Sequence, residues 1–147
     1  MNQYSISQVS EKLNIQKDTL RYYDKIKLIS PGRGENRYRY YTEADMMDLI
    51  YIQVMKFAGF SLGDMKKVLK NKNSKDHTSD CAAETMQLLK QKKSQTLVQI
   101  EVLQKLAELI SISIELLKGK TLNNPDEINN LVLNIHQNMK YSEGEKK

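Results

Sequence analysis

The spacing of apolar residues sets the second half of the chain apart from the first. Between Asp80 and Lys118 there is neither Gly nor Pro, and apolar residues recur at alternating steps of three and four. This spacing is typical of a helix with a coiled-coil seam, and it favours a dimer formed by an antiparallel helix pair. The apolar seam residues are Met86, Leu89, Ile100, Leu103, Ala107, Ile110, Ile114 and Leu117.

The length of this helix supports a dimer. At 1.5 Å per residue it would be about 58 Å long, which is too long for the inside of so small a domain. Two polar residues, Lys93 and Thr96, interrupt the seam. The alternative is a monomer in which the helix folds back on its own domain.

The first 71 residues have shorter apolar periods, which predict two short helices joined by a tight turn. Residues 4–6 are expected to be extended, and Ser7 suits the N-cap of a first helix that ends at Leu13. Asn14 tolerates the left-handed conformation often needed at a helix end. A second helix then covers residues 17–25. Two short helices and a tight turn are the outline of a helix-turn-helix.

Residues 31–41 predict a small β-hairpin. Pro31 stops any helix, and the turn-rich residues 32–36 follow. The next five residues, RYRYY, alternate with period two, as a strand does. This alternation places Arg37, Arg39 and Tyr41 on one face, so the hairpin forms a basic wing beside the second helix.

Two further helices are expected before the long one. Thr42 and Asp45 form a capping signal for a helix that runs to about Ala58. This helix is apolar nearly all round, so it is expected to be covered on more than one side. Ser61 starts the next helix.

The expected architecture is mainly α. A winged helix-turn-helix head covers residues 1–71, a linker covers 72–79, and the dimerisation helix covers 80–118. Residues 119–147 then form a loop, a short helix that begins at Asn124, and a disordered tail from residue 142. The inward face of the last helix is expected to hold Ile128, Leu131, Val132, Ile135 and Met139.

Charge is concentrated in the head. The chain has a net charge of +5, and residues 12–39 alone hold eight Lys or Arg against three acids. A concentrated basic patch suits a polyanion. One cysteine, no signal peptide and no apolar run near 18 residues favour a cytoplasmic protein without a membrane partner.

The second helix offers a polar arc to such a polyanion. At about 100° per residue, Lys17, Asp18, Arg21, Tyr22 and Lys25 fall on one side of it, with Leu20, Tyr23 and Ile26 opposite. A charged arc is usually a solvated face, and a hairpin can be solvated too. Together, however, the helix and a wing with Arg33, Arg37 and Arg39 suit a DNA groove and its phosphates.

Four segments, in this order and spacing, resemble the MerR family of bacterial transcription regulators. They are TLRYYDKI at 19–26, the proline at 31, YRYY at 38–41 and KFAGFSL at 56–62. The likeness covers roughly residues 3 to 70. It implies a homodimer that binds double-stranded DNA at a near-palindromic promoter element. It also implies that an effector changes the dimer so that an overlong promoter spacer is untwisted and bent for RNA polymerase.

The resemblance also assigns roles to residues. It implies DNA contacts from a recognition helix that carries Lys17, Thr19, Arg21, Tyr22 and Tyr23, and from a wing that carries Arg37, Tyr38 and Arg39. Lys56 matches a phosphate-contacting position. Two positions depart from the family, since Lys27 and Arg37 stand where many members have glycine. Both give up backbone freedom and add positive charge.

The effector is left open. Cys81 lies in the first turn of the long helix, where unsatisfied backbone amides favour a thiolate. It is a candidate redox or effector residue, and an inert thiol is the alternative. One thiol with His77 nearby is a thin donor set, so no metal site and no cofactor are expected. An unknown small molecule, a ligand at the dimer seam or another protein are the remaining effectors.

Two rival classes remain beside a transcription regulator. One is a recombination or phage accessory protein that shares the winged head and bends DNA. The other is a coiled-coil interaction module that binds no DNA. An enzyme is not expected, because the sequence has no His/Asp/Ser cluster, no phosphate-cradling glycine loop and no paired carboxylates at useful spacing.

Overall fold

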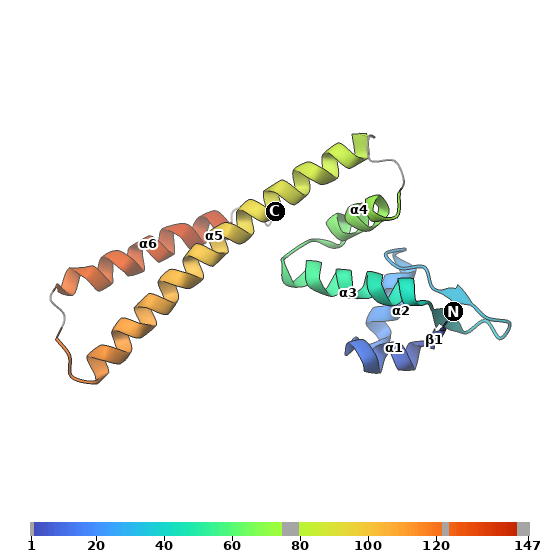
Figure 1. The fold of residues 1–147 in the computed structure, drawn as a ribbon, viewed down its shortest axis with the longest axis horizontal. Helices are drawn as coiled ribbons and strands as arrows, with labels where there is room; N and C mark the ends of the chain where they lie inside the picture. Colours follow the sequence, from blue (N-terminus) through green and yellow to red (C-terminus); the bar gives the residue numbers. More distant parts are fainter. Residues whose placement is uncertain (1, 75–79, 122–123, 144–147) are drawn as a thin grey trace. The chain divides into compact units, whose positions relative to one another are not determined.

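The computed structural model describes residues 2–74, 80–121 and 124–143. It divides into two compact units, Met1–Leu88 and Leu89–Lys147. The described part is mainly helical, with a small three-stranded sheet in the first unit. This confirms the fold class predicted from the sequence. Figure 1 labels the elements.

The first unit begins with the predicted pair of short helices. Helix α1 covers Ile6–Leu13 and helix α2 covers Lys17–Lys25. Between them, Asn14 has φ 51°, the left-handed conformation expected of it. The predicted N-cap, Ser7, is wrong. Ser5 caps the helix, because its hydroxyl accepts from the Gln8 backbone while the Gln8 side chain accepts from the Ser5 backbone.

Three short strands form the sheet. Strand β1 covers Tyr4–Ser5, β2 covers Gly32–Arg33 and β3 covers Arg39–Tyr41. The order is β1-β3-β2, and both pairings are antiparallel, with Tyr4 opposite Tyr41 and Arg33 opposite Arg39.

Strands β2 and β3 form the hairpin expected as a wing, but its second strand is shorter than predicted. Arg37 has φ 58°, which no strand residue adopts, and its backbone amide donates to the Gly34 carbonyl at 2.9 Å. Arg37 therefore lies in the turn and does not share a strand face with Arg39. A Cβ at Gly32 in β2 would overlap the ring of Tyr40, so a larger residue there would have to displace that ring.

Two helices complete the first unit, α3 over Glu43–Phe57 and α4 over Leu62–Lys72. Thr42 and Ser61 cap them in two further capping boxes, as the sequence indicated. The core is one cluster around fully buried side chains, which include Val9, Leu20, Leu49, Ile52 and Met65.

Among the described residues of this single copy, helix α3 is covered on one side only, and its coverage on a second side stays a prediction for the dimer. Met46, Leu49, Ile52 and Met55 are buried. Another strip remains exposed, and it consists of Met47, Ile50, Tyr51, Val54 and Phe57. The apolar pattern of a helix does not show whether residues of the same chain cover it on all sides or leave an apolar strip exposed.

The second unit is built on two helices. Helix α5 covers Asp80–Leu117, its first turns belonging to the first unit, and α6 covers Pro125–Glu143. Helix α6 runs back alongside α5 (Figure 1), and Lys105 donates to Asn134 between them at 2.5 Å. Asn124 caps α6 through the Asp126 amide at 3.0 Å, as predicted.

The inward face of α6 differs from the prediction. Ile135 is buried and Ile128 and Leu131 are half-buried, whereas Val132 and Met139 are exposed. The face against α5 is narrower than the apolar set in the sequence. The predicted disordered tail also starts too early, because residues 142 and 143 are helical.

Some expected boundaries fall outside the described residues, namely 75–79 of the linker and 144–147 of the tail. The start of the linker is helical, because α4 continues to Lys72. The first unit reaches Leu88, since Asn71 of α4 donates to Thr85 of α5 at 2.7 Å. The division at 72–79 stays a prediction.

Candidate nucleic-acid interface

The outward arc of α2 is exposed as the sequence predicted. Lys17, Arg21, Tyr22 and Lys25 are all accessible to solvent. Arg21 is held by Asp18 one turn earlier, at 2.6 Å between its Nη1 and the carboxylate. This arc presents three cations and a phenol from one short, rigid helix, a suitable surface for phosphates and base edges.

Tyr23 lies on the other side of α2, within the core. It is 6% exposed, and burial raises the pKa of its phenol above the ordinary value of 10.0. Its ring is therefore a packing group. Only the edge of Tyr23 that lines the neighbouring depression is positioned for a ligand.

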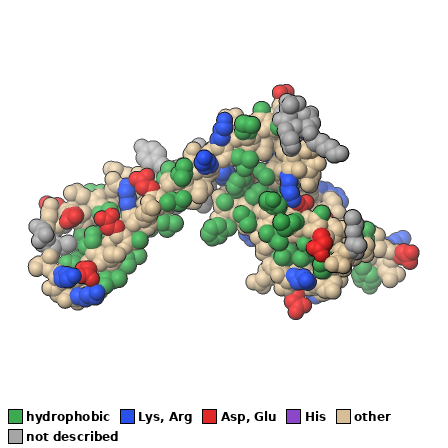
Figure 2. All heavy atoms as spheres, viewed as in Figure 1, with side chains coloured by type: hydrophobic (Ala, Val, Ile, Leu, Met, Phe, Trp, Pro, Cys, Tyr) green, Lys and Arg blue, Asp and Glu red, His purple; other side chains and the backbone are tan. Residues whose placement is uncertain are grey.

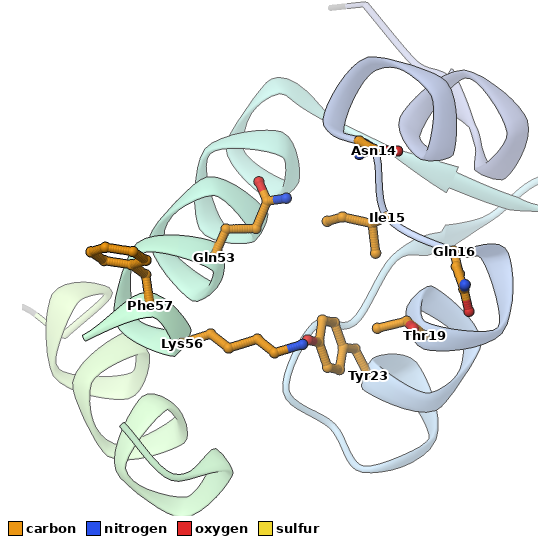
Figure 3. A pocket seen from close by; sticks show the side chains of 8 residues that line it. All are labelled: Asn14, Ile15, Gln16, Thr19, Tyr23, Gln53, Lys56 and Phe57. Carbon is orange, nitrogen blue, oxygen red and sulfur yellow. The ribbon is translucent and has the colours of Figure 1, made fainter. Parts of the chain in front are cut away.

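That depression lies between the helix-turn-helix and α3 (Figure 3). Thr19 and Tyr23 line it from α2, and Lys56 extends across it toward Tyr23. Gln53 fixes the wall, because its side-chain amide donates to the Leu13 carbonyl at 2.8 Å. Lys56 is exposed and forms no ion pair that the described residues show. It is therefore available to an anion on this side of α2.

The wing carries Arg33 on β2 and Arg39 on β3, and both bind one carboxylate. Arg33 Nη2 lies 2.7 Å and Arg39 Nε 2.8 Å from Asp24 Oδ2. The Asp24 side chain is only 7% exposed. The two arginines thus link the wing to the last turn of α2. Tyr38, 79% exposed, and Arg37 lie at the exposed tip.

Asp24 was not predicted as a site residue, although its position in the sequence carries a signal. At 100° per residue Asp24 falls within 40° of the buried Leu20, on the inward arc of α2. A carboxylate on a buried arc needs cationic or hydrogen-bonding partners. Arginines in a neighbouring hairpin were therefore candidates for that role as well as for phosphates.

The two positions that lack glycine keep a left-handed backbone. Lys27 has φ 59° and Arg37 has φ 58°. The Lys27 amide donates to the Asp24 carbonyl and the Leu28 amide to the Tyr23 carbonyl, which closes α2. The turn geometry is thus that of a glycine position, with a cation in place of hydrogen.

The predicted seam of α5 is exposed along its length. Figure 2 shows apolar side chains on the surface of this helix. The exposed seam side chains are Met86, Leu89, Ile100, Leu103, Ala107, Ile110, Ile114 and Leu117. Val102, which is not a seam residue, is buried. Helix α6 therefore leaves the seam uncovered.

The end of α5 is closed by charged residues. Glu115 pairs with Lys118 at 3.0 Å and with Lys120 in the following loop. Hydrogen bonds from Lys120 and Lys118 hold the pKa of Glu115 below its ordinary value of 4.5. These pairs tie the loop to the helix end.

Cys81 is half-buried in the first turns of α5. Its carbonyl accepts from Thr85 Oγ1 at 2.9 Å, and the Asn71 side-chain amide lies 3.6 Å from its sulfur. His77 lies outside the described residues. Within the described residues no three His, Cys, Asp or Glu side chains gather as metal ligands would.

The geometry defines a winged helix-turn-helix protein whose basic arc and wing share one unit. Residues 4–72 match the family model described as "MerR HTH family regulatory protein".

No helix within the described ranges combines the length and apolar character that a membrane span needs.

Relatives agree with the family model. An uncharacterised helix-turn-helix transcriptional regulator, YyaN of Bacillus subtilis strain 168, is 41% identical over 69 residues, 46% of this chain and 50% of that one. The chain spans about half the length of this relative. It spans a smaller share of some other relatives.

Solved structures extend the likeness beyond the head. HiNmlR, a MerR-family regulator lacking the sensor domain and bound to promoter DNA, has a TM-score of 0.68 at 27% identity, over 80% of this chain and 92% of that one. A putative MerR-family transcriptional regulator from Listeria monocytogenes has a TM-score of 0.66 at 26% identity, over 91% and 98%. Residues 4–72 therefore form a MerR-type helix-turn-helix domain, and the rest of the chain is similar in fold to MerR-family regulators.

Proposed function

We propose that the chain is a dimeric transcription regulator that binds double-stranded promoter DNA. The observation that carries this proposal is the exposed basic arc of α2 beside a wing of the same unit. In this account Lys17, Arg21 and Tyr22 enter the major groove, and the wing lies along the flanking backbone. The similar protein HiNmlR is bound to promoter DNA, which supports promoter DNA as the ligand.

The dimer is proposed to form through the seam of α5. Isolated single helices do not keep so many large apolar side chains in water without a partner. An antiparallel pair of α5 helices would bury the seam residues of both copies. Two heads held at a fixed separation would then match a near-palindromic element, because the symmetry of the site mirrors that of the protein.

The output is proposed to be distortion of the promoter spacer. Untwisting and bending DNA costs free energy that depends on sequence, and a dimer of fixed geometry can impose it. An effector that changes the separation of the heads would alter access by RNA polymerase. A small effector at the seam, or another protein, would act on that separation. The protein is expected to act in the cytoplasm, where promoter DNA lies.

The experiment combines selection and mapping. Wild-type protein is used to select duplexes from a random-sequence library, and the selected site is located upstream of its own and neighbouring genes. Anisotropy with a labelled duplex then gives the dissociation constant as a function of salt, and footprinting gives the site relative to the promoter.

We expect a palindromic site within a promoter spacer and an affinity that falls steeply with salt. A site outside any promoter would favour a DNA-bending accessory protein. No binding to duplex at low salt would contradict the proposal and favour an interaction module.

A further inference from the structure

Asp24 is a buried carboxylate at the last turn of α2 with the two wing arginines attached. We infer that Asp24 is a positioning residue that sets the wing at the angle at which both it and α2 reach DNA. The inference rests on the proposed function and adds a role for an acidic residue inside a basic interface.

The contacts join three separate elements. Asp24 Oδ2 accepts from Arg33 Nη2 of β2 at 2.7 Å and from Arg39 Nε of β3 at 2.8 Å. Lys27 Nζ, just after α2, lies 4.0 Å from Oδ1. Backbone hydrogen bonds hold β2 to β3. The carboxylate therefore fixes the hairpin to the helix through both of its strands.

Burial makes this attachment stronger than a surface pair. The Asp24 side chain is 7% exposed, and Arg39 is 28% exposed. Charge-assisted hydrogen bonds in such surroundings are strong, and a buried carboxylate without its partners is costly. The arginines are thus held in one arrangement before DNA arrives.

The arginines keep donors for a phosphate. A guanidinium has five N–H donors, and each arginine shows one bond to Asp24. Arg33 is 48% exposed, so much of its fork faces solvent. Three cations against one carboxylate leave the cluster at +2. The same groups can therefore hold Asp24 on one side and the DNA backbone on the other.

If Asp24 is removed, the positioning role and a purely electrostatic role predict opposite changes in the affinity for DNA. If Asp24 acted only as a negative charge in a basic surface, its removal would strengthen binding to a polyanion. If it positions the wing, its removal weakens binding in spite of the added positive charge.

The test compares Asp24→Asn with Glu11→Gln. Glu11 is exposed on α1 of the same unit and has no proposed contact with DNA, and both variants raise the net charge by one. Each variant is titrated with the labelled duplex selected by the wild-type protein, at several salt concentrations. Far-UV circular dichroism and thermal melting report the fold.

We expect Glu11→Gln to tighten binding slightly and Asp24→Asn to weaken it about tenfold, the effect of losing one charge-assisted hydrogen bond. Equal or tighter binding by folded Asp24→Asn overturns the inference while leaving the proposed function intact. If the wild-type protein selects no duplex, the proposed function itself fails.

A second variant keeps the inference testable if Asp24→Asn does not fold. The double variant R33K/R39K retains both charges and the carboxylate but loses the planar fork that orients each guanidinium. We expect weaker binding with an unchanged salt slope, because the charge is the same and the orientation is lost. Binding equal to wild type overturns the positioning role.

Discussion

The two units of the chain differ in the share of their apolar side chains that they bury within one copy. In the first unit, the buried cluster runs from Val9 to Leu69, and capping boxes start three of its helices. In the described part of the second unit, Val102 and Ile135 are the only buried apolar residues. Most of its other large apolar side chains are exposed. The head therefore has a core of its own, although it leaves the α3 strip exposed, whereas the helix pair leaves its whole seam available to a second copy.

This difference suggests that the first unit recognises DNA and that the second unit controls the first. Recognition of DNA needs a rigid surface, and the head provides one from its own contacts. Control of that surface needs an element that responds to something outside the head. An exposed helical seam can respond in that way, since its stability depends on what covers it.

Charging the seam is the largest expected perturbation. The variant Ile100→Glu/Leu103→Glu puts two carboxylates in a predicted antiparallel interface, where burial without partners is strongly unfavourable. We expect monomers and loss of operator binding, at least a hundredfold as an order-of-magnitude estimate for losing a second linked head. Sedimentation velocity and anisotropy measure the two effects.

The matched control is Ser94→Glu/Gln104→Glu. It adds the same charge to the same helix at exposed polar positions. It should remain dimeric and bind DNA. A dimer that survives in the seam variant would remove the difference between the two units, because the second unit would then not depend on the seam.

Removing Lys56 tests the head alone. Lys56→Ala should weaken binding to every sequence to a similar degree and reduce the salt slope by about one, as expected when one phosphate contact is lost. Lys70→Ala, on exposed α4 outside the depression, serves as the control and should leave the slope unchanged. Anisotropy over a range of salt concentrations checks both. An unaltered slope for Lys56→Ala excludes a phosphate contact there.

Glycine at position 27 should stabilise the head. Lys27 adopts φ 59°, which costs a non-glycine residue about 1 kcal/mol, and glycine removes that cost. Thermal melting of Lys27→Gly should show this gain. Arg21→Gly, in the middle of α2, should instead destabilise by about 1 kcal/mol. The same sign for both variants would contradict the left-handed assignment.

The smallest effect concerns Tyr41. Its ring is buried, and its hydroxyl has no hydrogen-bond partner in the described part of the chain. Tyr41→Phe should therefore leave stability at neutral pH unchanged or slightly higher. Tyr4→Phe, which loses the bond to Glu43, should lower it. Chemical denaturation of both variants measures the difference.

Alkaline pH sharpens this test. Burial raises the pKa of Tyr41 above its ordinary value of 10.0. The unfolded phenol loses its proton first, so the folded state loses stability as pH rises above about 10. Tyr41→Phe should reduce that loss. An identical pH dependence in the variant would show that Tyr41 does not contribute to it.

Local signals in the sequence predicted the elements well. Thr42 and Asp45, Asn14, and the apolar steps of the long helix each act within a few residues, and each lies in the structure where expected. Such features depend on backbone geometry and short-range hydrogen bonds, which a sequence contains directly.

Contacts between distant residues were not predicted. Arg33 and Arg39 were assigned to phosphates, and their attachment to Asp24 depends on how the hairpin meets the helix. Tyr23 was assigned both to packing and to DNA, and only the packed position of α2 places its ring in the core. The partner of a side chain follows from the tertiary arrangement, which helical periodicity does not provide.

The left-handed residues Lys27 and Arg37 also affect which sequences this fold accepts. Exposed sites ordinarily tolerate almost any side chain, β-branched ones included. At these two sites valine, isoleucine and threonine are the least compatible choices, whereas asparagine and aspartate fit the backbone without difficulty. The substitutions accepted at these two solvent-facing positions would therefore depend on whether the side chain is β-branched. At neighbouring exposed positions they would depend mainly on polarity.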